Sequence, residues 1–164
     1  MYYDQHLHSS FSSDSKEIAE NHLRRALALG MEGLCFTEHH DMDFPSGGPC
    51  DYRLDVSAYY KELSRLQQQY QDRLQVGIGV ELGIQPGLAP RLRAFAACRP
   101  FDFIIGSLHV AVGCDVMYPD YFQRFGTRQA YANYFADMIS CLEQFDDFDV
   151  LGHVDYVMRS GSGP

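Results

Sequence analysis

Histidines and carboxylates recur in this sequence at the ends of short apolar runs, a distribution that favours metal binding. His6 and His8 lie two residues apart at the end of the first run. On a strand that spacing points both side chains to the same face, where they can share one ion. A lone His-x-His pair is as easily two half-buried polar residues. The metal interpretation becomes stronger because this pair is one part of a larger set of candidate ligands. The full set is His6, His8, Asp14, His39, Glu81, His109 and His153.

Two of these positions also have ordinary structural interpretations. Asp14 can cap a helix as readily as it can bind a metal, and with Glu17 it fits a capping box at a helix start. In the run from Thr37 to Asp41, two adjacent histidines follow the strand. Alternation allows either to face a metal, and His39 is favoured over His40 because it is nearer the strand. The local patterns therefore indicate candidate ligands. They do not decide whether Asp14 binds a metal or caps a helix, or which of the two histidines faces a metal.

Glu81 lies in the apolar run from Gly77 to Gly83, where a carboxylate is costly to bury without a cation or several donors. A metal ion supplies that compensation. The alternative is a salt bridge to an arginine such as Arg53 or Arg91. The histidines after the next two apolar runs pose a similar choice between a ligand and a hydrogen-bonded core residue. Metal binding is the simpler explanation for Glu81, and the choice stays open for His109 and His153.

The types of donor indicate which metals and which reaction to expect. Imidazoles mixed with carboxylates favour Zn²⁺, Mn²⁺ or Fe²⁺ over Mg²⁺ or Ca²⁺. The candidates outnumber the ligands of a single zinc ion, so more than one ion is expected, with Glu81 suited to bridge two of them. Multinuclear sites of this kind typically hydrolyse phosphate esters. Arg159, six residues after His153, is a candidate for a bidentate contact with the substrate phosphate, the alternative being a solvated arginine.

Strand and helix patterns alternate along the chain. Apolar runs typical of buried parallel strands cover residues 2–7, 33–37, 74–82, 103–107 and 148–152. Between them, helical spacing marks a helix that ends near Gly30, a second over 56–70, a short third over 88–95 and a fourth over 131–142. Long polar segments at 41–55 and 114–127 are expected to be loops.

This alternation favours parallel strands joined by right-handed crossovers. The compatible folds are an open doubly wound sheet and a (β/α) barrel, and periodicity does not choose between them. In both folds the active site lies at the carboxyl edge of the strands. The candidate ligands end or follow the strands, so we expect that edge to collect them.

Composition excludes several functional classes. The chain has 164 residues, 46% of them hydrophobic, which fits one domain. Its net charge of -9 argues against nucleic-acid and anionic-membrane partners and leaves small molecules. The five cysteines form no Cys-x-x-Cys pair, and no run is apolar enough for a signal peptide or a membrane span. We therefore expect a cytoplasmic protein; its oligomeric state stays open.

Five ordered motifs resemble the polymerase-and-histidinol-phosphatase (PHP) family, and in particular its histidinol-phosphate phosphatase branch. The motifs are DQHLHSSFSSDS at 4–15, FTEH at 36–39, GVE at 79–81, FDFIIGSLH at 101–109 and GHVDYVMR at 152–159. The resemblance covers the chain from end to end. It implies a single PHP domain over residues 1–164, folded as an incomplete, distorted (β/α)7 TIM-like barrel with parallel strands alternating with helices.

The resemblance also implies a trinuclear metal site at the carboxyl rim of that barrel. The ligand sets that it implies for the three ions are, in turn, His6 with His8 and Glu81, Glu81 with His109 and His153, and Asp14 with His39. It matches Arg159 to an arginine that contacts the phosphate. Glu81 and Arg159 are therefore the residues to which the resemblance assigns catalytic roles.

The activity implied by the resemblance is hydrolysis of L-histidinol phosphate to L-histidinol and phosphate in histidine biosynthesis. The alternatives are a PHP phosphoesterase with another substrate, such as a nucleotide, and an inactive metal-binding remnant. Family members continue beyond this chain, which matches their N-terminal two-thirds, to a Gly-Ser-Asp-Ala-His-like motif. That motif supplies one further aspartate and one further histidine, so the chain on its own is expected to be poorly active unless a partner completes it.

Overall fold

The computed structural model describes residues 2–45 and 52–159 of the chain. These residues form two compact units, which are described one at a time. Unit 1 consists of Met1–His40, Cys50–Glu81 and Phe101–Ile105, and unit 2 consists of Asp41–Pro49, Leu82–Pro100 and Gly106–Pro164. The middle of the loop that we expected at 41–55 lies outside the described residues.

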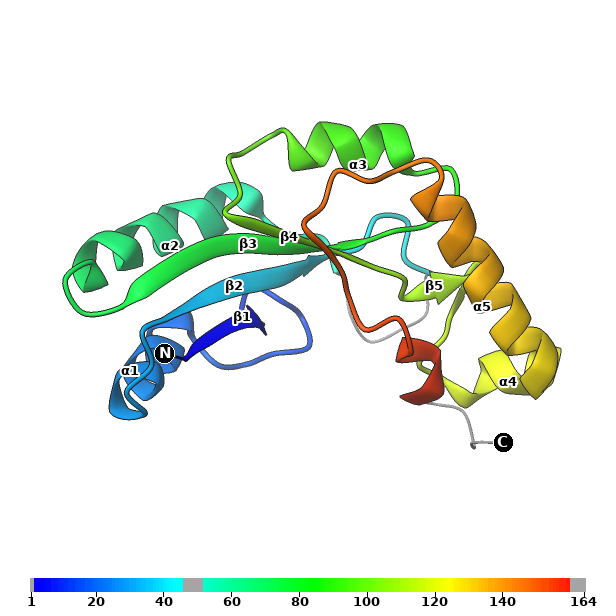
Figure 1. Cartoon of the computed structure of the whole chain (residues 1–164), viewed down its shortest axis with the longest axis horizontal. Helices are drawn as coiled ribbons and strands as arrows, with labels where there is room; N and C mark the ends of the chain where they lie inside the picture. The colour runs from blue at the N-terminus through cyan, green and yellow to red at the C-terminus, as the bar shows by residue number, and fades with distance from the viewer. Residues whose placement is uncertain (1, 46–51, 160–164) are drawn as a thin grey trace. The chain divides into compact units, whose positions relative to one another are not determined.

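Parallel strands alternate with helices through the described part of the chain (Figure 1). The strands of the main sheet are β1 (Tyr3–Leu7), β2 (Gly33–His40), β3 (Gln75–Gly83), β4 (Phe103–Ser107) and β7 (Val150–Leu151), paired in the order β1-β2-β3-β4-β7. The intervening helices are α1 (Ala19–Ala28), α2 (Val56–Tyr70), α3 (Ala89–Ala96), α4 (Pro119–Phe125) and α5 (Thr127–Leu142). This is the expected class, an incomplete TIM-like α/β fold. None of the described helices is long and apolar enough to span a membrane.

Helix α2 supplies much of the core of unit 1 and has the predicted bounds. It begins where the Asp55 side chain accepts a hydrogen bond from the Ala58 N–H at 3.0 Å, a standard N-cap. Its buried side chains recur at helical spacing; they are Tyr59, Leu63, Leu66 and Tyr70. Figure 1 shows α2 running along β3, and Gln67 Nε2 donates to the Val76 carbonyl of that strand at 2.8 Å. The apolar face thus explains both the helix and its position.

The start of α1 differs from the sequence-based expectation. Its N-cap residue is Ile18, which makes no side-chain capping hydrogen bond, so the capping box expected from Asp14 and Glu17 is wrong. Glu17 instead accepts a hydrogen bond from the Ile18 N–H at 3.0 Å, and Asp14 lies before the helix. The end of the helix is as expected, because Gly30 has a φ of 70°, which glycine adopts without strain.

Close approach of the strands in unit 1 depends on Gly79. A Cβ atom at this position would lie 2.5 Å from the Phe103 carbonyl oxygen and 2.9 Å from that of Phe36, so a larger residue would push the strands apart. The buried Tyr59 hydroxyl lies 3.0 Å from the Phe36 carbonyl oxygen and 2.9 Å from that of Gly79, and it donates its one proton to either. This packing holds together the two strands that carry His39 and Glu81.

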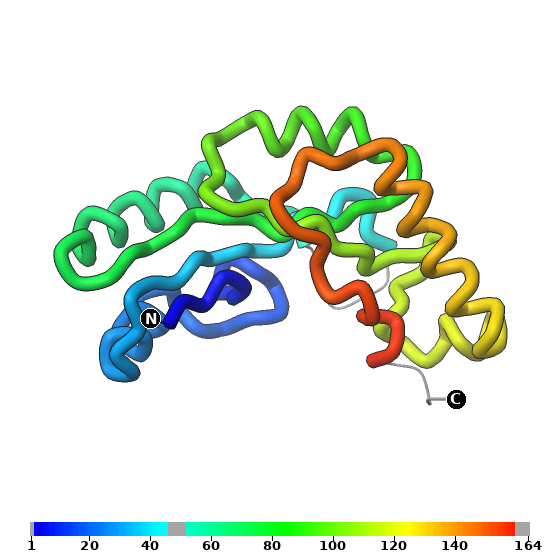
Figure 2. Tube along the Cα trace, viewed as in Figure 1, coloured from blue at the N-terminus to red at the C-terminus, as the bar shows by residue number. Residues whose placement is uncertain are grey.

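Unit 2 contains secondary structure where a loop was expected. The segment 114–127 includes strand β6 (Cys114–Asp115), which pairs antiparallel with β5 (Val110–Ala111), and the whole of α4. Only Gly126 separates α4 from α5, and Figure 2 shows the path of the chain through this segment. The expectation was wrong because two-residue strands and a seven-residue helix are too short to show a periodic pattern. A 3₁₀ turn, η1 (Tyr156–Arg159), follows β7.

Candidate metal centre

Five of the predicted ligands lie in unit 1, at or just beyond the carboxyl ends of β1, β2 and β3. They are His6, His8, Asp14, His39 and Glu81. Their side chains converge, since potential ligand atoms lie within 4.8 Å of one another in two overlapping groups. The groups are His6 with His8 and Glu81, and His8 with Asp14 and His39.

Glu81 is a fully buried carboxylate with three imidazoles around it. Its Oε1 atom lies 3.6 Å from His6 Nε2, and its Oε2 atom lies 3.4 Å from His8 Nε2 and 3.1 Å from His39 Nδ1. Arg91, one of the arginines considered as its partner, instead forms an ion pair with Asp43. The surroundings of Glu81 are therefore rich in imidazole nitrogen.

The spacing of these atoms fits a shared cation. Two ligands that are each about 2.1 Å from a tetrahedral zinc ion lie about 3.4 Å apart. The separations of His6 Nε2 and His8 Nε2 from the Glu81 carboxylate, 3.6 and 3.4 Å, are close to that value. Nitrogen mixed with carboxylate oxygen is also the donor chemistry of zinc sites. The residues present fit a divalent metal ion of this type.

His39 and the adjacent His40 have different environments. His39 Nε2 lies 3.4 Å from Asp14 Oδ2, and its ring stacks on that of His8 with centroids 4.3 Å apart. The hydrogen bond with His39 lowers the pKa of Asp14, which keeps this carboxylate ionised. His40 Nδ1 accepts a hydrogen bond from the Leu54 N–H at 3.1 Å, a structural contact. Of the two histidines, His39 is the one in the cluster.

Burial lowers the pKa of His8 to about 4, and the neighbouring His39 adds to the effect. The neutral imidazole that metals require is thus the form present near pH 7. This folded-state pKa lies below the unfolded value of 6.5, so between pH 6.5 and 4 the unfolded chain binds a proton more readily than the folded chain does. The contribution of His8 to the free energy of unfolding is therefore complete above pH 6.5 and is lost as the pH falls towards 4. We expect the metal-free chain to lose about 2–3 kcal/mol of unfolding free energy from this group between pH 7 and 4.5.

Urea unfolding at the two pH values measures this loss. The matched control is His8→Gln, which cannot titrate in this range and should show a smaller decrease between pH 7 and 4.5. An equal decrease for the wild-type chain and for His8→Gln would contradict the assignment to His8.

Unit 2 holds the next predicted ligand, His109, against a buried carboxylate. His109 Nδ1 lies 2.6 Å from Asp41 Oδ1, and both side chains are buried. A Cβ atom at position 83 would lie only 2.1 Å from this same Asp41 oxygen, so Gly83 leaves the space that the carboxylate occupies. Carboxylate–histidine pairs of this kind orient the opposite ring nitrogen of metal ligands. Asp41 was not singled out in the sequence because its partner is 68 residues away.

The remaining predicted residues, His153 and Arg159, lie near His109 in unit 2. The His109 and His153 ring centroids are 5.4 Å apart, and Tyr156 contacts both rings, at 5.0 and 4.8 Å. The Arg159 guanidinium carbon lies 5.0 Å from the centroid of the Tyr156 ring. Sequence reasoning missed Tyr156, although it lies inside the last motif. That His109 and His153 share an ion with Glu81 stays a prediction.

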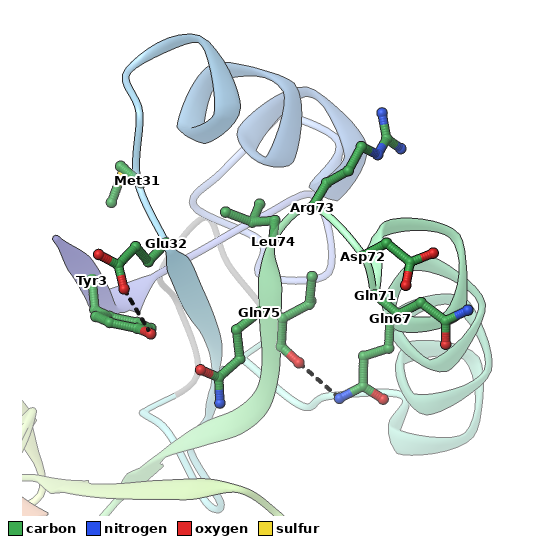
Figure 3. A pocket seen from close by; sticks show the side chains of 10 residues that line it. Tyr3, Met31, Glu32, Gln67, Gln71, Asp72, Arg73, Leu74 and Gln75 are labelled. Carbon is green, nitrogen blue, oxygen red and sulfur yellow. Dashed lines mark hydrogen bonds between the residues drawn. The ribbon is translucent and has the colours of Figure 1, made fainter. Parts of the chain in front are cut away.

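A hollow in unit 1 lies at the opposite, amino-terminal ends of β1, β2 and β3 (Figure 3). Its volume is about 510 Å³. Its buried lining residues are the apolar Leu74 and Val76, whereas polar residues on its wall, such as Glu32 and Arg73, are exposed. Lacking buried polar groups among the lining residues described, this hollow is a weaker candidate for a functional site than the histidine cluster.

The fold and the cluster define a TIM-like α/β protein with a candidate divalent-metal centre at its strand ends. The model of the PHP domain family matches residues 4–163. The chain therefore belongs to the PHP family, as the five motifs indicated.

Two relatives align with nearly the whole of this chain. The histidinol-phosphatase of Lactococcus lactis subsp. lactis is 35% identical over 161 residues, which cover 96% of this chain and 58% of the relative. A protein of Clostridium acetobutylicum named "Probable histidinol-phosphatase" is 28% identical, with 97% of this chain and 59% of the relative covered. The chain thus spans somewhat more than half the length of these relatives.

Solved structures agree with this relationship. The histidinol phosphate phosphatase of Lactococcus lactis subsp. lactis, crystallised with zinc, L-histidinol and phosphate, has a TM-score of 0.90 and is 33% identical. The similarity covers 98% of this chain and 60% of that one. A protein from Listeria monocytogenes has a TM-score of 0.65 at 20% identity, over 82% of this chain and 59% of that one, and supports the fold alone.

Proposed function

We propose that this chain forms part of a histidinol-phosphate phosphatase, which hydrolyses L-histidinol phosphate to L-histidinol and phosphate in histidine biosynthesis. The observation that carries the proposal is the structural similarity to the Lactococcus protein, whose crystals contain zinc, L-histidinol and phosphate. The convergence of His6, His8 and Glu81 supplies independent support, because the donor set suits zinc. A cytoplasmic location, a single domain and a small phosphate ester as substrate belong to the same proposal.

We assign the metal ligands to both units. The proposed ligands of two to three ions are His6, His8, Asp14, His39, Glu81, His109 and His153. Zinc is the preferred metal, with manganese and iron as alternatives that the same donors accept. When bound, such ions stabilise negative charge on the phosphate oxygens and lower the pKa of a coordinated water.

The chain's own residues contribute binding and orientation. The buried Glu81 carboxylate would supply the negative charge that holds the cations, because the neutral imidazoles around it would be ligands without a charge of their own. Asp41 holds the ring of His109 in a fixed orientation through the 2.6 Å contact. Arg159 is exposed and its guanidinium binds the substrate phosphate through paired N–H donors.

Phosphate release from histidinol phosphate tests the function. We expect the chain with added Zn²⁺ or Mn²⁺ to release phosphate slowly from L-histidinol phosphate, but faster than from a nucleoside monophosphate, and we expect chelation to stop this release. Faster release from the nucleotide would favour a PHP phosphoesterase with another substrate. Metal binding without release from either compound would identify the chain as a metal-binding remnant.

A further inference from the structure

Glu38 is a fully buried carboxylate beside the metal centre that the proposed function does not use. Its Oε1 atom accepts a hydrogen bond from the Ser9 hydroxyl at 2.6 Å, and its Oε2 atom accepts one from the Ser12 hydroxyl at 2.6 Å. The Ser9 N–H lies 3.0 Å from both oxygens. In these contacts Ser9 and Ser12 are the hydrogen-bond donors, which suits an ionised carboxylate that only accepts.

The Ser12 hydroxyl connects Glu38 to two residues of the candidate metal centre, His8 and His39. Besides Glu38, its Oγ atom lies 2.9 Å from the His39 backbone nitrogen and 3.2 Å from His8 Nδ1. A hydroxyl has one proton and two lone pairs. The 2.6 Å contact with the carboxylate takes the proton, because hydrogen bonds to a charged acceptor are the stronger ones. The His39 N–H takes one lone pair, so the remaining lone pair faces His8 and can only accept.

His8 must therefore donate from Nδ1, which fixes its tautomer. A neutral imidazole with a proton on Nδ1 has a lone pair on Nε2. That Nε2 atom lies 3.4 Å from Glu81 Oε2, the other candidate ligand of the same group. Two acceptors facing each other at this distance repel unless a cation lies between them.

We propose that Glu38 is a positioning residue, which acts through Ser12 to fix His8 as the Nδ1–H tautomer and so directs the Nε2 lone pair to a metal ion. The inference rests on the proposed function only in taking a metal ion as the partner of Nε2. The tautomer itself follows from hydrogen bonds among residues 8, 9, 12, 38 and 39. It does not require that the chain hydrolyse any substrate.

His6 provides an internal comparison. Its Nδ1 atom lies 2.8 Å from the Thr37 hydroxyl oxygen, which also accepts a hydrogen bond from the Leu7 N–H at 3.2 Å. The Leu7 N–H takes up a lone pair of the Thr37 hydroxyl and does not use its proton, so Thr37 can donate to His6 Nδ1 or accept from it. A change at Glu38 should therefore alter the tautomer of His8 and leave that of His6 as it was.

Nitrogen-15 NMR of the histidine side chains in the metal-free chain near pH 7 tests the proposal. We expect the wild-type His8 to be the Nδ1–H tautomer, with its signals assigned by their loss in His8→Gln. Glu38→Met removes the acceptor, so the Ser12 proton becomes available to His8 and the Nε2–H tautomer should appear. Zinc affinity should fall about 10- to 100-fold in this variant, as when other groups that orient metal ligands are removed.

Two further variants guard against a folding defect in Glu38→Met. Ser12→Ala removes the acceptor for His8 and should give a mixture of tautomers, whereas Ser12→Thr keeps the hydroxyl and should retain the wild-type tautomer. An Nε2–H tautomer in the wild-type chain, or an unchanged His8 tautomer in folded Ser12→Ala, would overturn the proposal. The His8 tautomer is measured without metal or substrate. The NMR result therefore stands even if the chain releases no phosphate in the phosphatase assay.

Discussion

Glu81→Gln should lower the zinc affinity of the chain by at least about 100-fold while leaving it folded. Glutamine keeps the size of the side chain but removes the negative charge, and loss of one ligand costs more than the roughly 10- to 100-fold typical of groups that only orient ligands. The buried position and the three surrounding imidazoles make this carboxylate the centre of the cluster. Competition with a chromogenic chelator measures the affinity, and circular dichroism checks folding.

The matched control for this substitution is Glu143→Gln, which makes the same chemical change at an exposed position. Glu143→Gln should bind zinc as the unsubstituted chain does. If folded Glu81→Gln also bound zinc with unchanged affinity, the assignment of Glu81 as a ligand would have to be abandoned. Retained phosphate release in Glu81→Gln would likewise remove its catalytic role.

Tyr59→Ala should destabilise the chain by about 3–5 kcal/mol, the range for truncating a large buried aromatic side chain. Tyr59 is fully buried, its ring packs against Phe11 with centroids 5.5 Å apart, and its hydroxyl lies between carbonyls of β2 and β3. Tyr59→Phe keeps the ring and loses only the hydrogen bond, so it should cost about 1 kcal/mol. Urea unfolding of the metal-free chain measures both values.

The control here is Tyr2→Ala, at a side chain that is 73% exposed. A surface substitution of this kind should change the unfolding free energy by less than about 0.5 kcal/mol. A loss for Tyr59→Ala no larger than that of Tyr2→Ala would show that Tyr59 does not hold the two strands together.

The sequence predicts the elements of unit 1 well where apolar residues repeat regularly. Helix α2 has the predicted bounds because its buried residues follow helical spacing without interruption. Strand β2 extends to His40, three residues beyond the predicted end, because buried polar residues continue the strand and interrupt the apolar pattern. Strand β7 is shorter than predicted, since only Val150 and Leu151 pair. Apolar patterns thus predict where a strand lies better than they predict its first and last residues.

The candidate ligands could be listed from the sequence because imidazoles and carboxylates at strand ends are unusual without a metal. Their supporting contacts could not be predicted. Glu38 reaches Ser12 across 26 positions, and Asp41 reaches His109 across 68. These partners meet only when the strands are folded, and no local pattern marks them. Asp14 illustrates the same limit of local patterns. Its local sequence suits a helix cap, but in the structure it does not cap α1 and instead contacts His39.

Zinc-edge anomalous diffraction from crystals grown with zinc tests most directly whether these side chains bind a metal. We predict an anomalous peak about 2.0–2.2 Å from His6 Nε2, His8 Nε2 and a carboxylate oxygen of Glu81, the distances of zinc to nitrogen and oxygen ligands. A zinc-soaked crystal with no peak among these three side chains, and with Glu81 paired to an arginine, would contradict the metal centre and the phosphatase proposal built on it.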